Sequence, residues 1–310
     1  MSTVDAAGAS AVPRPEVQST TGPELDGKSA SRALKDQIAR ILVWGCFFIA
    51  CIPLVWILGS AIVKGGGMLV DPGWWTHSQL GITARKAGGG AVHAIQGSLL
   101  QAGVTAVIAV PIGVMTAVYL VEYGRGKIAR AISFMVDILT GVPSIVAALF
   151  VYAVWVTTLG FQRVAFAVCL ALMLLMIPTI VRSTEEMLKL VPNELREASY
   201  ALGVPKWKTI FKIVLPTAFS GIVTGILLGL ARIMGETAPL LILGPYTKSI
   251  ATNLFNGNMA TLPTMINQDR TEARAAAIDR VWGASLTLIL IILILNLLGR
   301  VIARYSKVRN

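Results

Sequence analysis

Long runs of apolar residues constrain this chain more than any other feature of its sequence. Hydrophobic residues make up 55% of its 310 residues, and charged residues only 14%. A helix needs about 20 consecutive apolar residues to cross the hydrocarbon core of a bilayer, and several runs approach or exceed this length. Lipid offers the backbone no hydrogen-bond partners, so these runs are predicted to be helices. A transmembrane β-barrel is excluded, because barrel strands alternate in hydrophobicity with a period of two residues.

We therefore predict an all-α polytopic membrane protein with about six transmembrane helices. The spans are predicted at residues 41–63, 93–121, 132–157, 164–181, 217–244 and 281–303. Pro111, Pro143, Pro178 and Pro239 lie within or beside these spans and are expected to kink or break the helices locally. The break at Pro143 either frees backbone groups to line a pathway or marks packing of small residues. Asp137, near one end of the third span, is expected to lie at the membrane interface.

The region before residue 63 divides into two parts. Residues 1–30 are rich in Ala, Ser, Pro, Gly and Thr, and are predicted to form a disordered cytoplasmic tail. Residues 31–63 are predicted to hold a short charged surface helix and the first transmembrane helix, which is too long and too far along the chain to be a cleaved signal. Residues 22–29, GPELDGKS, fit the P-loop pattern, but no strand precedes them as a nucleotide site requires. No nucleotide site is predicted there.

Basic residues are distributed unevenly between the two sides of the predicted helices. Of the 27 Lys and Arg residues, 18 fall on the side of the N terminus, eight on the opposite side, and Arg232 within a span. The positive-inside rule then places both termini in the cytoplasm. The net charge of +11 reflects this topology. No nucleic-acid partner is predicted, because the basic residues are scattered along loops rather than gathered on one face.

The sequence offers little for catalysis or metal binding. Cys46, Cys51 and Cys169 all fall inside predicted spans, which does not support a disulfide framework. His77 and His93 have no cysteine or carboxylate cluster at metal-ligand spacing, so no metal or other cofactor is predicted. No nucleophile and base stand out either. The chain is therefore predicted not to be an enzyme itself.

The connection between the fourth and fifth spans, about residues 183–216, is predicted to be folded. Pro192 and Asn193 mark the start of a helix over 194–202, and Gly203 and Pro205 mark its end. A second helix, 206–214, is predicted to lead to the membrane. A short external helix with small residues on one face can be gripped by a groove in another protein. The alternative is an amphipathic helix that touches only lipid headgroups, with its lysines on the polar side.

A motif in this connection resembles the EAA loop of ABC importer permeases. The residues are Glu197-Ala-Ser-Tyr-Ala-Leu-Gly203, followed by an I-x-L-P stretch that ends at Pro216. Ser199 stands where the pattern has a second alanine, which exchanges one small side chain for another. The resemblance implies a type I ABC importer permease fold (MetI-like) within residues 90–305. It also implies that the ATPase-coupling residues are Glu197, Ala198, Ser199, Gly203 and Pro216.

Four further motifs are similar to those of phosphate-uptake permeases of the PstA type. They are VPSIV at residues 142–146, IPTIVRSTEE at 177–186, GLARIMGETAP at 229–239 and ATLP at 260–263. The resemblance implies a multi-pass protein of the cell membrane that transports inorganic phosphate. It further implies three partners: a pair of cytoplasmic ATP-binding subunits, a second related permease subunit and an extracytoplasmic phosphate-binding protein.

The third of these motifs places two charges in the fifth predicted span. Arg232 and Glu236 are four residues apart, so on one helix they face each other and form a neutral pair. Ionisable residues within a membrane are functional candidates by default. A guanidinium stays charged and matches the oxygens of phosphate, so Arg232, Glu236 and Thr237 are predicted to line the substrate pathway. The alternative is a structural ion pair that never meets substrate.

We predict a permease subunit that moves phosphate inward while partner ATPases hydrolyse ATP. The alternatives are a permease for another oxyanion, such as molybdate or sulfate, a secondary anion transporter with Glu236 as proton carrier, and a sensor of the binding protein. No internal repeat of broken spans supports the secondary transporter. Residues 271–279 are predicted to form a short external helix, which either docks the binding protein or serves only as a connector.

Overall fold

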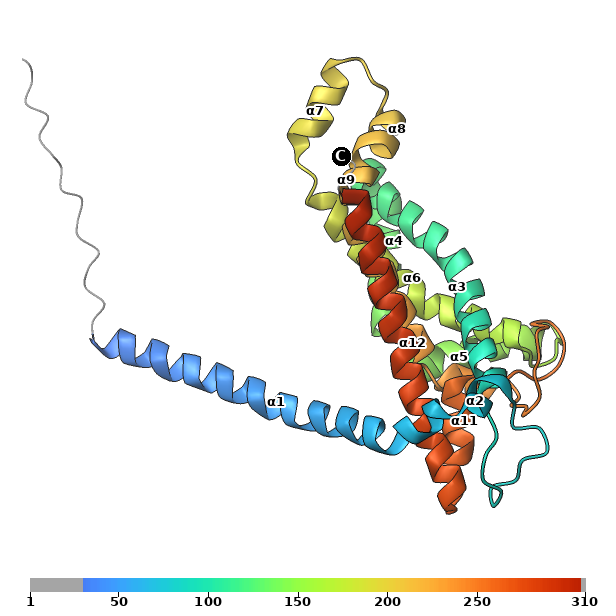
Figure 1. Ribbon diagram of the computed structural model, residues 1–310. Helices are drawn as coiled ribbons and strands as arrows, with labels where there is room; N and C mark the ends of the chain where they lie inside the picture. Colours follow the sequence, from blue (N-terminus) through green and yellow to red (C-terminus); the bar gives the residue numbers. More distant parts are fainter. Residues whose placement is uncertain (1–29, 308–310) are drawn as a thin grey trace, which may run out of the picture. The chain divides into compact units, whose positions relative to one another are not determined.

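The computed structural model describes residues 30–307, and in this part of the chain every regular element is helical (Figure 1). The chain divides into two compact units, Met1–Trp56 and Ile57–Asn310. The predicted tail and the P-loop match lie outside the described residues. In the first unit the described residues belong to α1 (Ala30–Val70), which continues into the second unit and covers both the predicted surface helix and the first span.

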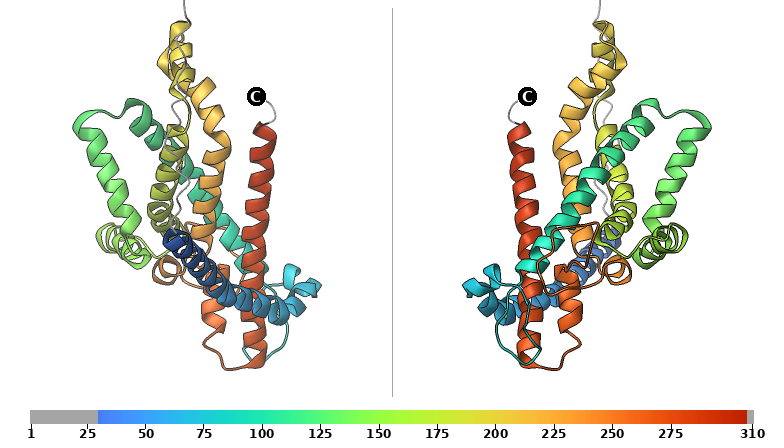
Figure 2. Two further views of the ribbon diagram at one scale, coloured as in Figure 1. Left: turned by 90° about the vertical axis from the view of Figure 1, so that its left-hand side faces the viewer. Right: turned by 90° about the vertical axis from the view of Figure 1, so that its right-hand side faces the viewer.

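Four long helices form the core of the second unit: α3 (Val92–Val118), α6 (Ala165–Lys189), α9 (Leu215–Met234) and α12 (Ala275–Lys307). α3 packs on α6, α6 on α9, and α9 on α12. Figure 2 shows α12 on one side of this row and α4 on the other. Gly221 and Gly225 of α9 lie directly against Met187 and Ser183 of α6. Small residues at this crossing let two backbones approach closely, as is common where helices pack in a membrane.

The third predicted span is not one straight helix. α4 (Gly126–Gly141) and α5 (Ser144–Tyr152), which continues as the π-helical segment η2 (Ala153–Thr158), meet at an angle of 109°. The bend lies at Val142 and Pro143, where the backbone is extended, because proline disfavours a helical conformation in the residue before it. Within residues 30–307, five helices are long and apolar enough to cross a membrane, or six if the bent pair is one span. By contrast, α3 and α6 continue through Pro111 and Pro178.

The fifth predicted span, 217–244, is also interrupted, which agrees with the expectation that Pro239 kinks or breaks it. α9 ends at Met234, Gly235 caps it, and α10 (Ala238–Leu243) begins after Thr237. Pro239 can occupy the first turn of α10 but not the interior of a longer helix, because it lacks an N–H and clashes with the preceding turn. The helix predicted over 206–214 is continuous with the span, because helical structure runs without a break from Lys206 to Met234.

Short helices cover both ends of the bundle. At one end lie α7 (Asn193–Ala201), α8 (Lys206–Thr209), the π-helical segments η1 (Tyr119–Tyr123) and η3 (Ile210–Val214), and the C-terminal end of α12 (Figure 1). At the opposite end lie α2 (Pro72–Thr76) and α11 (Leu262–Asp269). The separate helix predicted over 271–279 is wrong, because α12 begins at Ala275 and runs on into its span.

Candidate functional site

Arg232 and Glu236 flank the break between α9 and α10. Arg232 lies in the last turn of α9, where its carbonyl accepts a 3.2 Å hydrogen bond from the Gly235 N–H. The Nε of Arg232 is 3.9 Å from Oε1 of Glu236, which is an ion pair but is too long for a hydrogen bond. The Arg232 side chain is 44% exposed and that of Glu236 18%. The two charges therefore meet as the spacing predicted, but across a helix end.

This geometry leaves the Arg232 guanidinium available. Within residues 30–307, no hydrogen bond to another group holds its donors. A guanidinium has five N–H donors in a planar fork that fits phosphate oxygens. Thr237 stands beside the pair at the first position before α10, and its hydroxyl makes no capping bond there. The three residues predicted for the pathway thus lie together at the break between α9 and α10.

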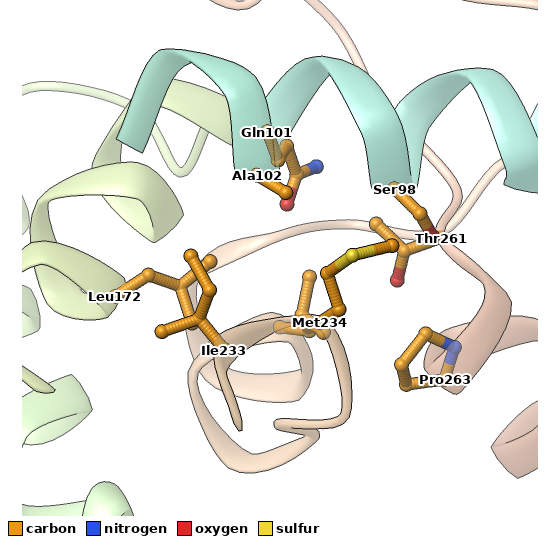
Figure 3. Close-up of a pocket in the computed structure, with 9 residues that line it drawn as sticks. Ser98, Gln101, Ala102, Leu172, Ile233, Met234, Thr261 and Pro263 are labelled. Carbon is orange, nitrogen blue, oxygen red and sulfur yellow. The ribbon is translucent and has the colours of Figure 1, made fainter. Parts of the chain in front are cut away.

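A small cavity of about 10 Å³ lies on the buried side of this break (Figure 3). Ile233, Met234 and Leu240 line it from the α9–α10 segment, opposite Ser98 and Gln101 of α3. The Gln101 side chain is buried, and its Oε1 has no hydrogen-bond partner among the described residues. The cavity is about the size of one water molecule, so it cannot itself admit phosphate. The exposed face of the break, which carries Arg232, is the side where an anion can be bound.

The loop that carries the EAA motif is folded as two short helices joined by a tight turn. Gly203 has a φ of +74°, a conformation that L side chains rarely adopt, and it ends α7 as predicted. The Ser199 and Thr209 hydroxyls are buried and lie 2.8 Å apart, which ties α7 to α8. Ser199 therefore faces α8 rather than the surface. Glu197 and Ala198 are exposed, and Pro216 lies in the first turn of α9.

Large apolar side chains are exposed on the same loop. Leu195, Tyr200, Leu202, Trp207 and Phe211 all lie at the surface of α7, the turn, α8 and η3. Exposed apolar side chains of this kind can contact another protein or, in the alternative interpretation, the lipid headgroups. The loop thus has an inner face that fixes its own shape and an outer face that can receive a partner.

An ion pair between this loop and the end of α3 was not predicted from the sequence. Arg196 of α7 pairs with Glu122 of η1 at 2.9 Å, and their side chains are only 12% and 6% exposed. No local pattern reveals the pair, because its members are 74 residues apart in sequence.

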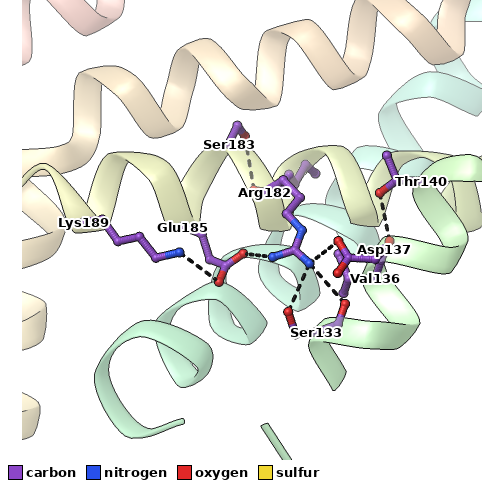
Figure 4. A network of polar contacts seen from close by, with 9 residues as sticks. Ser133, Val136, Asp137, Thr140, Arg182, Ser183, Glu185 and Lys189 are labelled. Atoms are coloured by element: carbon purple, nitrogen blue, oxygen red, sulfur yellow. Dashed lines mark hydrogen bonds and ion pairs between the residues drawn. The ribbon is translucent and has the colours of Figure 1, made fainter. Parts of the chain in front are cut away.

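A second unpredicted network joins α4 to α6 (Figure 4). Arg182 donates to Oε2 of Glu185 at 2.5 Å and to the carbonyl and hydroxyl of Ser133 at 3.1 Å, and it pairs with Asp137. Asp137 is the residue predicted to lie at the membrane interface, and Arg182 belongs to the motif at 177–186. Their opposite charges at neighbouring span ends were the signal that could have paired them.

The end of the bundle that carries α2 and α11 holds a buried polar network. Arg280 donates to Asp269 at 3.1 Å, Gln79 donates to the same carboxylate oxygen at 2.9 Å, and Tyr246 donates to Gln79 at 3.1 Å. Burial, reinforced by the negative charge of Asp269, raises the pKa of the Tyr246 hydroxyl far above its usual value. His93, at the start of α3, contacts the Tyr246 hydroxyl at 3.5 Å. The network holds the loops that contain Gln79 and Tyr246 against α11 and α12.

Residues 109–309 match the protein family described as the inner membrane component of binding-protein-dependent transport systems. The fold and the match together define the class of this chain: a transport permease of that type. Its relatives show which family within this class the chain resembles. The phosphate transport system permease protein PstA 1 of Mycobacterium tuberculosis H37Rv is 56% identical over 87% of this chain and 88% of the relative. PstA of Yersinia pestis is 41% identical over 90% and 94%. The chain belongs to the PstA family.

Solved structures agree with this fold. The inward-facing MetNI methionine ABC transporter matches with a TM-score of 0.57 and 21% identity, over 69% of this chain and 95% of that chain. A bacterial alginate ABC transporter, in complex with its pentasaccharide-bound periplasmic protein, matches with a TM-score of 0.58 and 14% identity, over 88% and 94%. At such low identity these likenesses concern the fold alone. They confirm the predicted MetI-like permease architecture.

Proposed function

We propose that this chain is the permease subunit of an ATP-driven importer for inorganic phosphate. The observation that carries the proposal is its 56% identity to a phosphate transport permease over 87% of the chain. The residues that match the family include both the loop with the EAA motif and the broken helix with Arg232. Together they supply a surface for a driving partner and a cation for an anionic substrate.

The partners follow from this function. A pair of cytoplasmic ATP-binding subunits docks on the apolar outer face of α7 and α8. A second, related permease subunit completes the pathway, and an extracytoplasmic phosphate-binding protein delivers the anion at the end that carries α2 and α11. The chain lies in the cytoplasmic membrane with both termini in the cytoplasm, as the excess of basic residues on that side favours.

The loop with the EAA motif, about residues 183–216, is called the coupling loop below. It acts on the pathway through one continuous helix. Helical structure runs for 29 residues from Lys206 to Met234, a length of about 43 Å at 1.5 Å per residue. α8 receives the motion of the ATP-binding subunits, and Pro216 lies within the same continuous helical segment. The far end of this segment is the break at Gly235. Movement of the loop therefore displaces Arg232 relative to α10 and opens the pathway to one side at a time.

Arg232 is the group that meets the passing anion. Its free donors form charge-assisted hydrogen bonds to phosphate oxygens, which are stronger than neutral ones. Glu236 stays close enough to keep Arg232 in position and to compete with the anion, so that phosphate is not held too tightly to leave. Thr237 contributes a hydroxyl donor from the first position before α10.

The coupling role is tested with the complete complex in proteoliposomes. Gly203→Arg places a bulky side chain at a left-handed backbone position on the docking surface, and is expected to abolish copurification of the ATP-binding subunits and phosphate uptake. Gly160→Arg is the matched control, since Gly160 has a similar φ of +70° outside the coupling loop. Gly203→Asn separates strain from bulk, because asparagine tolerates this conformation.

Intact assembly and uptake in Gly203→Arg would rule out the coupling role. Competition by sulfate and molybdate against labelled phosphate identifies the substrate in the same preparation. If sulfate or molybdate is transported as well as phosphate or better, that anion is the substrate. The class of transporter stays the same.

A further inference from the structure

We infer that Arg196 and Glu122 form a latch through which the coupling loop also moves α3, in addition to α9. This inference rests on the proposed function, because it concerns how the motion of ATP-binding subunits reaches the pathway. The latch consists of Arg196 of α7 and Glu122 of η1, with Lys206 of α8 as a second arm.

The central contact of the latch is a buried, hydrogen-bonded ion pair. Oε1 of Glu122 accepts two hydrogen bonds from Arg196, at 3.1 Å from Nε and 2.9 Å from one terminal nitrogen. Both side chains are almost completely buried. Two donors on one oxygen fix the guanidinium in position, and low exposure protects the pair from screening by salt. The contact is therefore both strong and directional.

Arg196 also binds the end of α6. Its guanidinium donates to the carbonyls of Val191 at 2.6 Å and Leu188 at 3.0 Å. These carbonyls follow the last turns of a helix, where backbone acceptors lack intrahelical partners and favour a cation. One side chain thus joins three elements that are separate in sequence: the coupling helix, the end of α6 and the end of α3.

Lys206 of α8 makes a second contact with η1, at Glu122 and Tyr123. Its ammonium donates to the main-chain carbonyl of Glu122 and lies 4.7 Å from the centre of the Tyr123 ring. A cation over an aromatic face is attracted by the ring quadrupole. Both helices of the coupling loop, α7 and α8, therefore hold the same five-residue segment.

The segment they hold is continuous with a long helix to the outer end. α3 and η1 together run for 32 residues from Val92 to Tyr123. At the outer end, the Ser98 hydroxyl of α3 accepts a 2.8 Å hydrogen bond from the backbone N–H of Leu262 in α11. π-helical segments inside α-helices are frequently found at functional sites. The latch thus connects the docking surface to the outer loops through α3.

The ionic character of the latch points to a role beyond stability. A buried ion pair is weak support for stability, because apolar side chains of similar size often stabilise a core as well or better. A pair of opposite charges has one feature that apolar packing lacks: it depends on charge at nearly constant side-chain size. The latch therefore predicts loss of coupling when either charge is removed, and partial retention when Arg196 is replaced by lysine.

The experiment measures phosphate moved per ATP hydrolysed by the complete complex in proteoliposomes. Glu122→Gln and Arg196→Gln are expected to retain ATP hydrolysis within about twofold while phosphate uptake falls at least tenfold. Arg196→Lys, which keeps the positive charge without the planar fork, is expected to retain at least a third of the wild-type ratio. Lys189→Gln is the matched control, because Lys189 is an exposed cation nearby on α6 whose loss should leave the ratio unchanged.

Two results would overturn the latch: a wild-type ratio in both Glu122→Gln and Arg196→Gln, or parallel loss of hydrolysis and uptake in both variants. Hydrogen exchange gives a reading independent of the anion. A non-hydrolysable ATP analogue should change exchange at residues 119–123 in the wild-type complex and not in Glu122→Gln. Unchanged exchange in both would also refute the latch. A wild-type complex that shows this exchange difference but moves no phosphate would instead refute the proposed function.

Discussion

Two arginine–carboxylate pairs in this chain have the same chemistry and opposite surroundings. Arg280 and Asp269, at the outer end, are 3.1 Å apart with side chains only 1% and 5% exposed. Arg280 also donates to the carbonyl of Lys86. Arg232 and Glu236, at the helix break, are 3.9 Å apart, and the arginine is 44% exposed. The first guanidinium is bonded to the protein through Nε and one terminal nitrogen, whereas no hydrogen bond among the described residues holds the second.

The difference shows how one residue type serves two purposes. Burying a charge is unfavourable unless close partners replace the lost hydration. A buried arginine is therefore tolerated only when its donors are used. Such an arginine has nothing to offer a passing anion. An arginine whose partner is held at a distance retains its capacity to bind, and the neighbouring carboxylate limits the strength of that binding. Removing each arginine should therefore damage a different property.

Arg280→Gln should have the largest effect, and it should act on folding. Loss of one partner leaves the Asp269 carboxylate buried without its countercharge, which costs about 3–5 kcal/mol in comparable buried pairs. We expect a strong loss of monodisperse protein in detergent and a lower thermal unfolding midpoint. Arg270→Gln is the control, because Arg270 is exposed and binds only Asn267 on its own helix end. Equal yields and midpoints for the two variants would contradict the distinction drawn between the pairs.

Arg232→Gln should have the second-largest effect, and it should act on transport. A hydrogen bond to a charged group contributes about 1.5–3 kcal/mol, which corresponds to roughly a 10–150-fold loss of phosphate uptake. Its unfolding midpoint should remain close to that of wild type, and Arg232→Lys should retain part of the activity, since a lysine keeps the charge without the planar fork. Normal uptake by well-inserted Arg232→Gln would refute the pathway role. Loss of insertion in both Arg232→Gln and Glu236→Gln would indicate a structural pair.

The two pairs also show what could be predicted from the sequence. Arg232 and Glu236 are four residues apart, so helical spacing alone brought them together. Arg280 and Asp269 are 11 residues apart, and Arg280 depends on the carbonyl of Lys86, 194 residues away. Such contacts are set by how helices pack and not by local pattern. Hydropathy predicted the spans for a related reason, because each span depends only on its own residues. Pro143 and Pro239 likewise marked the two spans that break, whereas the 109° angle between α4 and α5 depends on how these helices pack.

The smallest predicted effect concerns pH and the Tyr246 hydroxyl, which belongs to the outer pair's network. Its pKa in the folded protein is raised by burial and by Asp269, so the folded state favours the neutral phenol. The stabilisation is fully present below the unfolded pKa of about 10 and is lost as the pH rises above that value, because the unfolded chain then releases its proton first. The thermal midpoint of the wild-type protein should therefore fall more steeply above pH 10 than that of Tyr246→Phe. The substitution removes the hydrogen bond to Gln79 at every pH, so its midpoint should be lower by a constant amount below pH 10. Parallel curves above pH 10 would show that the Tyr246 hydroxyl reaches water and that this part of the outer network is open, in contrast to the closed pair beside it.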